Sequence, residues 1–237
     1  LYIANCQVKN LDFASDKPNL KTFELWDCGI TSDMLSGIHD LPALEMLNLS
    51  YNRITYVDNL ALETMPNLKT LYLNNNYIHD FRPLIKSGVR RKHIGNQGDP
   101  AELLSGDLAA ALRESLNVKE RRVVTQEQLD RICALTVVNG EVTFHTYDGE
   151  IDPDADMLEW LVSIQRDAGD YWIFGLEQLG WGGFSDGDFQ SMSEDEFDLS
   201  QLKVFRNLRY FHLTNRKAVN TDALAGLPLR RLVMVNC

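Results

Sequence analysis

The sequence predicts an α/β fold: a solenoid of stacked coils with a parallel concave sheet, interrupted by an irregular, acidic α/β insertion. Three observations predict it. A short apolar pattern occurs three times between Leu20 and Ile78, starting every 24 residues at Leu20, Leu44 and Leu68. The pattern returns after residue 200, and the residues between lack it and are strongly acidic. We therefore expect N-terminal repeats (1–98), an acidic insertion or irregular repeats (99–200) and C-terminal repeats (201–237).

The three copies align position for position over 20–30, 44–54 and 68–78. Each reads L-x-x-L-x-L-x-x-N/C-x-I, with Phe23 at the second leucine of the first copy. The pattern resembles the leucine-rich repeat family, whose signature has a period in the twenties. The resemblance implies coils that bury their apolar edges by stacking. It also implies a ladder of inward side chains that bond buried backbone groups, here Cys6, Cys28, Asn52 and Asn76.

Alternation within each strand turns the leucines inward and leaves the intervening side chains on the concave face. Aromatic residues recur at these solvent-facing positions, and Tyr and Trp are enriched at protein-binding hot spots. The alternative is that the insertion folds over them and buries them. The partner-binding residues that we expect are Tyr2, Glu24, Trp26, Asn48, Tyr51, Tyr72, Asn74, Tyr210 and His212.

The repeat frame weakens at both boundaries of the insertion. The segment 89–94 reads as a degenerate strand with Lys92 at a leucine position and a solvated basic run around it. In the C-terminal repeats, Arg216 stands where the ladder asparagine is expected. Leu1–Cys6 and Leu232–Cys237 have nearly the same amino-acid sequence, and neither end shows a polar cap. This indicates either a longer solenoid or repeat ends that pack against something.

The first half of the insertion shows helix and hairpin signals. Asp99-Pro100 begins a predicted helix of roughly 17 residues, with an apolar stripe of Leu104, Leu108, Leu112 and Leu116. A second cap at Thr125 predicts a short helix that carries Leu129, Ile132 and Cys133. Asn139-Gly140 favours a two-residue hairpin turn.

No part of 99–200 shows the repeat frame, and its second half carries further element signals. A third helix is expected from Asp152, a strand at Tyr171–Phe174 and a tight aromatic loop at Trp181–Phe184. Ser185–Asp198 is acidic, and we expect it to be an exposed and mobile loop.

Composition bounds the protein class. The chain is 44% hydrophobic and 24% charged, and no apolar run reaches the ~20 residues of a membrane span. The cysteines form no Cys-rich caps, which favours reduced thiols and an intracellular, cytoplasmic location. A removed leader stays an alternative, because no Met begins the sequence. The four cysteines are Cys6, Cys28, Cys133 and Cys237.

The net charge of −11 is unevenly distributed. Residues 99–200 hold 23 acidic and 6 basic side chains, whereas 201–237 hold 7 basic and 1 acidic. The simplest interpretation is that basic side chains of the C-terminal repeats pair with acidic side chains of the insertion within the molecule. For this reason we do not expect nucleic acid as a partner.

Catalytic signals are weak. The acidic run from His145 to Asp156 lacks the ligand spacing of a metal site. Asp152-x-Asp154-x-Asp156 starts like a calcium loop, but Met157 replaces the required Gly. We therefore expect no catalytic residues, no metal and no cofactor, and a protein that is not an enzyme.

The family resemblance implies a scaffold for protein–protein recognition on the concave face, and this is our first functional hypothesis. One alternative is an acidic inhibitor or immunity-type protein that neutralises a basic or nucleic-acid-binding partner through residues 99–200. A second alternative is an enzyme whose site lies in the insertion. The partner's identity does not follow from the fold.

Overall fold

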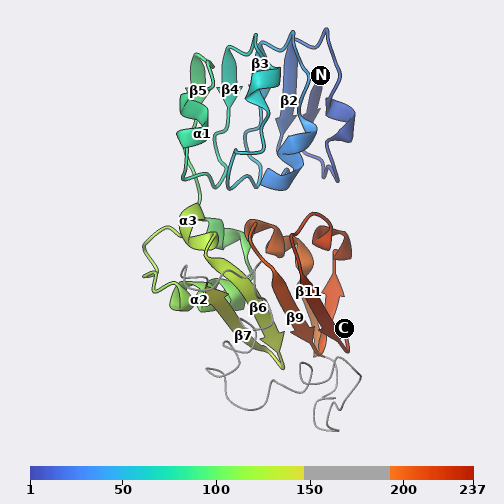
Figure 1. The fold of residues 1–237 in the computed structure, drawn as a ribbon, viewed down its shortest axis with the longest axis vertical. Helices are drawn as coiled ribbons and strands as arrows, with labels where there is room; N and C mark the ends of the chain where they lie inside the picture. Colours follow the sequence, from blue (N-terminus) through green and yellow to red (C-terminus); the bar gives the residue numbers. More distant parts are fainter. Residues whose placement is uncertain (147–192) are drawn as a thin grey trace. The chain divides into compact units, whose positions relative to one another are not determined.

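The computed structural model describes residues 1–146 and 193–237, and they form two compact units (Figure 1). Unit 1 consists of residues 1–104 and 123–126, and unit 2 of the described parts of 105–122 and 127–237. The helix expected from Asp152, the strand at Tyr171–Phe174 and the aromatic loop at Trp181–Phe184 lie outside the described residues.

Unit 1 is a stack of repeat coils whose strands form one parallel sheet in chain order (Figure 1). Equivalent repeat positions pair directly, so Phe23 lies opposite Leu47, and Leu47 opposite Leu71. All three side chains have no exposed area, as the inward half of the L-x-L pattern predicts. The parallel repeat sheet is confirmed. Its strands are β1 (Tyr2–Ala4), β2 (Thr22–Trp26), β3 (Met46–Asn48), β4 (Thr70–Tyr72) and β5 (Arg91–His93).

Short helical segments return the chain from one strand to the next. They place apolar side chains such as Leu35 and Leu84 against the strand leucines, in one continuous core. None of these segments could bury its apolar side alone, so the coils stabilise one another by stacking. The segments are 3₁₀ helices at Asp12–Ala14, Ser32–Gly37, Leu62–Thr64 and Pro100–Leu103, and helix α1 (Arg82–Ile85).

The asparagine ladder of unit 1 bonds buried backbone groups of neighbouring coils. The Oδ1 of Asn52 accepts hydrogen bonds from the N–H groups of Cys28 and Ile30, both at 3.0 Å. Its Nδ2 donates to the carbonyls of Leu25 at 2.8 Å and Leu49 at 2.9 Å. One buried amide therefore satisfies four backbone groups that would otherwise lose solvation without a partner.

The ladder extends through thiols at one side and through an amide at the other. Cys28 is buried, and its Sγ contacts the carbonyl oxygens of Ile3 and Trp26. Burial, together with its contact to Cys6, raises the pKa of the Cys28 thiol to about 11. Cys6 lies in the same line, with its Sγ 4.0 Å from that of Cys28, but it is exposed.

Gln97 continues the ladder where the frame appears degenerate. Its Oε1 accepts from the N–H of Ile78 at 2.9 Å, and its Nε2 donates to the carbonyl of Leu73 at 2.8 Å. The preceding strand β5 pairs with β4 and sets Lys92 opposite Leu71. The Nζ of Lys92 folds back onto the carbonyl of Val89 at 2.6 Å. The predicted degenerate strand is thus a complete repeat with a longer amide in the ladder.

The residue before each ladder position turns the chain at a sharp corner, and we call this position the corner. Corner residues have a positive φ, which Asn and Asp tolerate best among residues with a Cβ. Most corners are Asn or Asp, and the exception is Tyr51 with a φ of 60°. The corners are Asn5, Asp27, Tyr51, Asn75 and Asn96 in unit 1, and Asn139, Asn215 and Asn236 in unit 2.

Unit 2 contains a four-stranded sheet in the order β11–β9–β6–β7 (Figure 1). Strands β11, β9 and β6 run parallel, with Leu135 opposite Phe211 and Phe211 opposite Leu232. Strand β6 is therefore a repeat strand, which the sequence pattern had not revealed. Strand β7 joins β6 as an antiparallel hairpin. These strands are β6 (Ile132–Val138), β7 (Glu141–Thr146), β9 (Tyr210–Thr214) and β11 (Arg231–Val235).

The predicted hairpin at Asn139-Gly140 is confirmed, since both residues have a positive φ, of 50° and 85°. The expected short helix is confirmed as α3 (Gln126–Leu129). Its extension to Ile132 and Cys133 is wrong, because both residues are buried in β6. Four consecutive buried residues, from Ile132 to Leu135, suit a covered strand better than one helix face.

The predicted helix of roughly 17 residues is also wrong in its length. A 3₁₀ turn starts at the predicted cap, where the Oδ1 of Asp99 accepts from the N–H of Ala101 at 3.0 Å. The backbone then becomes extended at Leu104 and Ser105, and α2 (Gly106–Ser115) begins separately. The boundary between units 1 and 2 falls at this break. Leu108 and Leu112 are fully buried, so that part of the stripe is confirmed.

The expected exposed loop Ser185–Asp198 is wrong in its described part. Residues Ser193–Asp198 form β8, which pairs in parallel with β10 (Arg216–Val219). Phe197 is 1% exposed and lies beside Phe211, with ring centroids 5.8 Å apart. A single buried aromatic ring anchors a segment whose acidic composition suggested a loop.

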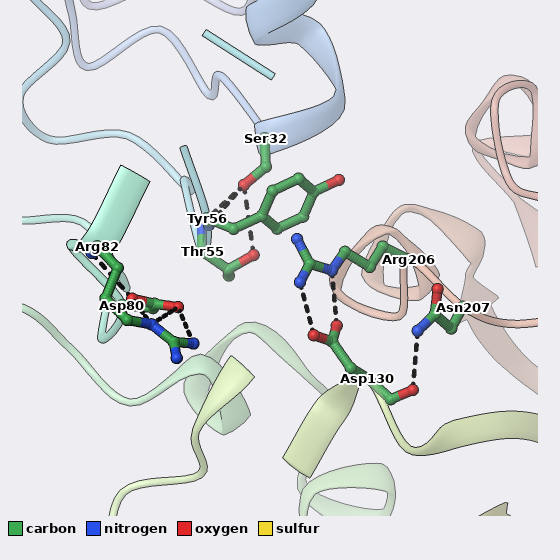
Figure 2. A network of polar contacts seen from close by, with 8 residues as sticks. All are labelled: Ser32, Thr55, Tyr56, Asp80, Arg82, Asp130, Arg206 and Asn207. Atoms are coloured by element: carbon green, nitrogen blue, oxygen red, sulfur yellow. Dashed lines mark hydrogen bonds and ion pairs between the residues drawn. The ribbon is translucent and has the colours of Figure 1, made fainter. Parts of the chain in front are cut away.

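Charge pairing within unit 2 is confirmed. Arg206 makes a two-pronged ion pair with Asp130, from Nε to Oδ1 at 2.7 Å and from the terminal nitrogen to Oδ2 at 2.6 Å (Figure 2). Asn207 adds a bond from its Nδ2 to the Asp130 carbonyl at 2.9 Å. Further pairs join Arg216 to Asp107 and Lys217 to Glu196. Basic side chains of 201–237 thus neutralise carboxylates of 99–200.

The departure at Arg216 does not leave the second repeat stack without an amide ladder. Asn236 donates from Nδ2 to the Oδ1 of Asn215 at 2.8 Å, and Asn215 likewise bonds Asn139 at 2.6 Å. In unit 2 the corner asparagines form the chain of amides, one position before the expected ladder. Arg216 instead reaches Asp107. Burial alone would raise the pKa of Asp107, but hydrogen bonds from Ser105, the Leu108 N–H and Arg216 hold it below its usual value.

Candidate protein-binding face

The outward positions of strands β1–β5 form one surface of unit 1, which we call the sheet face. Its members alternate with the buried leucines, so they follow from the strand period. Most are partly or fully exposed, with Thr70 buried at 8%. The sheet face consists of Tyr2, Ala4, Thr22, Glu24, Trp26, Met46, Asn48, Thr70, Tyr72, Arg91 and His93, with Tyr51 and Asn74 just beyond the strand ends.

The first aromatic pair on the sheet face joins two neighbouring coils. The ring centroids of Trp26 and Tyr51 are 5.0 Å apart, with an angle of 57° between the planes. This tilted geometry is favourable for aromatic rings. Trp26 is partly buried by the contact, whereas Tyr51 keeps 49% of its surface exposed. Tyr2 on the adjacent strand is 66% exposed. The pair is held in place, yet it presents apolar area to solvent.

The second pair joins β4 and β5. The rings of Tyr72 and His93 are stacked, with centroids 4.3 Å apart and planes inclined by 9°. His93 was not among the residues that we predicted for the face. The signal was present, because the frame of β5 puts His93 opposite Tyr72 and Arg91 opposite Thr70. The basic run was interpreted as a solvated coil, so the outward direction of Arg91 and His93 was not predicted.

Polar side chains between the aromatic pairs are fixed by hydrogen bonds. Asn48 donates from Nδ2 to the Oε2 of Glu24 at 3.3 Å and accepts from the Ser50 N–H at 3.0 Å. Asn74 accepts from the Gly95 N–H at 2.9 Å. Side chains that are already ordered lose less conformational entropy when a partner binds.

Seven of the nine expected contact residues lie in unit 1. The other two expected contact residues, Tyr210 and His212, lie in unit 2 on β9. They are partly buried, and the Tyr210 hydroxyl lies 3.4 Å from the Nδ1 of His212. Burial raises the pKa of Tyr210. Burial first, and the charge of Arg231 second, lower the pKa of His212 to about 4. His212 is therefore neutral at pH 7, and both residues are less accessible than Tyr2 and Tyr51.

Other polar groups of unit 1 in Figure 2 have structural roles. The Ser32 hydroxyl accepts hydrogen bonds from the N–H groups of Thr55 at 2.8 Å and Tyr56 at 3.0 Å. It satisfies backbone donors in the buried return of the next coil. Asp80 and Arg82 form a local ion pair at 2.6 Å. We assign no binding role to either group.

No cluster of three or more His, Cys, Asp or Glu in 1–146 and 193–237 is arranged to hold a metal ion. The carboxylates from Asp148 to Asp156 lie outside those ranges. None of the described helices is sufficiently long and apolar to cross a membrane.

Comparison with known proteins identifies the repeat. Residues 42–86 match the family model for leucine-rich repeats, in two copies, which confirms the predicted resemblance. Among solved structures, the chain matches the crystal structure of an internalin (inlF) from Listeria monocytogenes, with 18% identity and a TM-score of 0.30. The match covers 92% of this chain and 61% of the internalin chain, so this chain spans less than two thirds of that protein.

Proposed function

We propose that this chain, which carries leucine-rich repeats, is a non-enzymatic interaction module that binds a protein partner on the sheet face of unit 1. One observation carries the proposal. Large aromatic rings stand on the solvent side of the sheet, and neighbouring strands hold them in fixed pairs, Trp26 with Tyr51 and Tyr72 with His93.

The physical argument concerns where aromatic area is useful. A ring in the core would stabilise the fold, but Tyr2 and Tyr51 remain 66% and 49% exposed. The apolar area of an exposed ring leaves water only when a second surface covers it, and this removal is favourable. Tyr and Trp have few rotatable bonds, so covering them costs little conformational entropy. These rings therefore favour association more than they favour folding.

The repeat architecture supports the same proposal. Parallel strands in register place equivalent residues of successive coils side by side, about 4.8 Å apart. Glu24, Asn48 and Tyr72 therefore form a continuous surface drawn from segments far apart in the chain. Repeat proteins use extended surfaces of this kind for recognition.

Affinity capture with matched variants tests the proposal. The whole chain is immobilised, and proteins that it retains from a lysate of the source organism are quantified. Trp26→Ala should lose a specific retained protein, because the variant removes the central ring of the face. Phe13→Ala is the control, since Phe13 is an aromatic residue with 40% exposure outside the sheet face. Equal retention by wild type and Trp26→Ala, with both variants folded, would refute binding at this face.

A further inference from the structure

The sheet face carries charges of opposite sign on two of its strands, β2 and β5. On β5, Arg91 and His93 point outward and are exposed. On β2, Glu24 points outward, and Asp27 is exposed just after the strand. Trp26 lies on β2 itself, and Tyr51 and Tyr72 lie on the two coils between β2 and β5. The face is therefore polarised across the strands, from acidic at β2 to basic at β5.

The basic side is not neutralised. In the described parts of the chain, neither Arg90 nor Arg91 forms an ion pair, whereas the neighbouring Lys69 pairs with Glu45 at 2.5 Å. Lys92 bonds a carbonyl of its own coil. Arg91 is thus an exposed guanidinium with unused donors beside a stacked Tyr72–His93 pair. Such a group binds carboxylates well, because its fork of N–H donors matches both oxygens.

We propose that the partner presents an acidic peptide segment to this face, with its carboxylates against Arg91 and His93 and an apolar side chain against Trp26 and Tyr51. This rests on the proposed function, because it assumes that the sheet face is the contact surface. Strands β2 and β5 are three strand spacings apart, about 14 Å. An extended chain covers that distance in roughly four residues. The apolar and acidic positions of the segment should therefore be about four residues apart.

The total charge does not argue against an acidic partner. The chain carries −11 overall, but residues 1–98 contain ten acidic and ten basic side chains. Charges more than about 10 Å away are largely screened at physiological salt. The local field at β5 therefore depends mainly on the charged side chains of unit 1 nearest to that strand, with Arg90 and Arg91 among them.

A nucleic acid fits this face less well than a peptide does. Single-stranded nucleic acids need a groove of positive charge that follows several phosphates. Here the positive side chains occupy one strand, and Glu24 and Asp27 would repel phosphates on the other side. Tyr72 and His93 already stack on each other, which limits their use as a platform for bases.

Selection of short random peptides against the whole chain tests the inference. The enriched sequences should be rich in Asp and Glu, although the chain is acidic overall. The tightest synthetic peptide is then measured with four proteins: wild type, Arg91→Glu, Lys86→Glu and Trp26→Ala. Arg91→Glu should weaken binding about tenfold. Lys86→Glu makes the same charge change on an exposed residue at the end of α1, off the sheet face, and should change the affinity less than twofold.

The outcomes separate this inference from the proposed function. Neutral or basic peptides that depend on Trp26 but not on Arg91 would overturn the acidic partner and leave the binding face intact. Peptides unaffected by Trp26→Ala would count against the face itself. Displacement of the peptide by a short single-stranded oligonucleotide at equal concentration would favour nucleic acid and overturn the inference. Thermal unfolding of each variant establishes that it folds, and His93→Glu places a second negative charge on the same strand.

Discussion

The Nδ2 of Asn215 donates a 2.6 Å hydrogen bond to the Oδ1 of Asn139, 76 residues earlier in the chain. Asn236 donates to Asn215 in turn, so three coils of unit 2 are joined through their corners. Strands β6 and β9 therefore belong to one repeat stack, although they are far apart in the chain. The corner asparagines stabilise the junction in two ways, by bonding across coils and by tolerating a positive φ.

Asn215→Ala should destabilise unit 2 by about 2–4 kcal/mol, from the lost buried hydrogen bonds and the cost of Ala at a φ of 57°. Asn215→Gly should cost about 1 kcal/mol less, because glycine accepts this φ without strain. Hydrogen exchange of the β6 and β9 amides measures the effect locally. Equal exchange in the Ala and Gly variants would show that the backbone contribution is absent.

Asn52→Ala should destabilise unit 1 by about 3 kcal/mol or more, since it leaves buried N–H groups of Cys28 and Ile30 without their acceptor. Asn67→Ala is the matched control. Asn67 is exposed and bonds a single carbonyl, that of Pro42, so its loss should cost about 1 kcal/mol or less. Chemical denaturation of the two variants gives the comparison. Similar losses at both positions would contradict the structural role of the ladder.

Trp26→Ala should reduce the free energy of unfolding by only about 1–2 kcal/mol, because part of the ring is already in solvent. A fully buried aromatic residue would cost roughly 3–5 kcal/mol. If a protein partner docks on the face, the variant should lose on the order of 2 kcal/mol of binding free energy or more. Melting temperature and partner affinity, measured on this variant, distinguish an open face from a covered one.

Unit 2 should lose stability in mildly acidic solution through His212. The pKa of this imidazole falls from 6.5 to about 4 in the folded chain, mainly because of burial and also because of the charge of Arg231. The hydroxyl of Tyr210 lies 3.4 Å from its Nδ1. The unfolded chain then binds more protons between these pH values, so stability is complete above pH 6.5 and falls towards pH 4. The full effect is up to about 3 kcal/mol.

Replacing the imidazole isolates its contribution to that pH dependence. His212→Gln should flatten the decrease in unfolding free energy between pH 6.5 and pH 4. His39→Gln is the control, because His39 lies in unit 1 and forms an exposed pair with Asp40. Denaturation curves across this pH range should differ between wild type and His212→Gln alone. An unchanged slope in that variant would argue against a buried neutral imidazole.

Sequence periodicity predicted the first repeat stack well, because each inward leucine of β2–β4 has a counterpart 24 residues away. It missed the ladder role of Gln97, since the signature allows Asn or Cys at that position and gives no reason to expect a longer amide there. The expected helix ran past Ser105 because spacing alone carries no information on backbone breaks. An extended Leu104 and Ser105 become apparent only in three dimensions.

Strand β6 was missed for another physical reason. The two residues that follow it, Asn139-Gly140, form both a hairpin turn and the corner of a repeat coil. The turn signal is the stronger local pattern. The outward positions of the sheet face were predicted where alternation was regular, at Trp26, Asn48 and Tyr72. His93 was missed because Lys92 occupies the leucine position beside it. Tertiary burial of Tyr210 and His212 could not be derived from alternation, which gives direction but not coverage.

Tyr51 shows how one coil departs from an optimal repeat. Every other described corner at this position carries Asn or Asp, which suit a positive φ, whereas Tyr51 holds a φ of 60° at a cost of roughly 1 kcal/mol. Designing this scaffold by averaging its repeats would therefore replace Tyr51 with Asn and yield a more stable protein. The same redesign would remove the ring that packs on Trp26 and alter the face that we propose for partner binding. Consensus engineering of this solenoid must leave that corner unchanged.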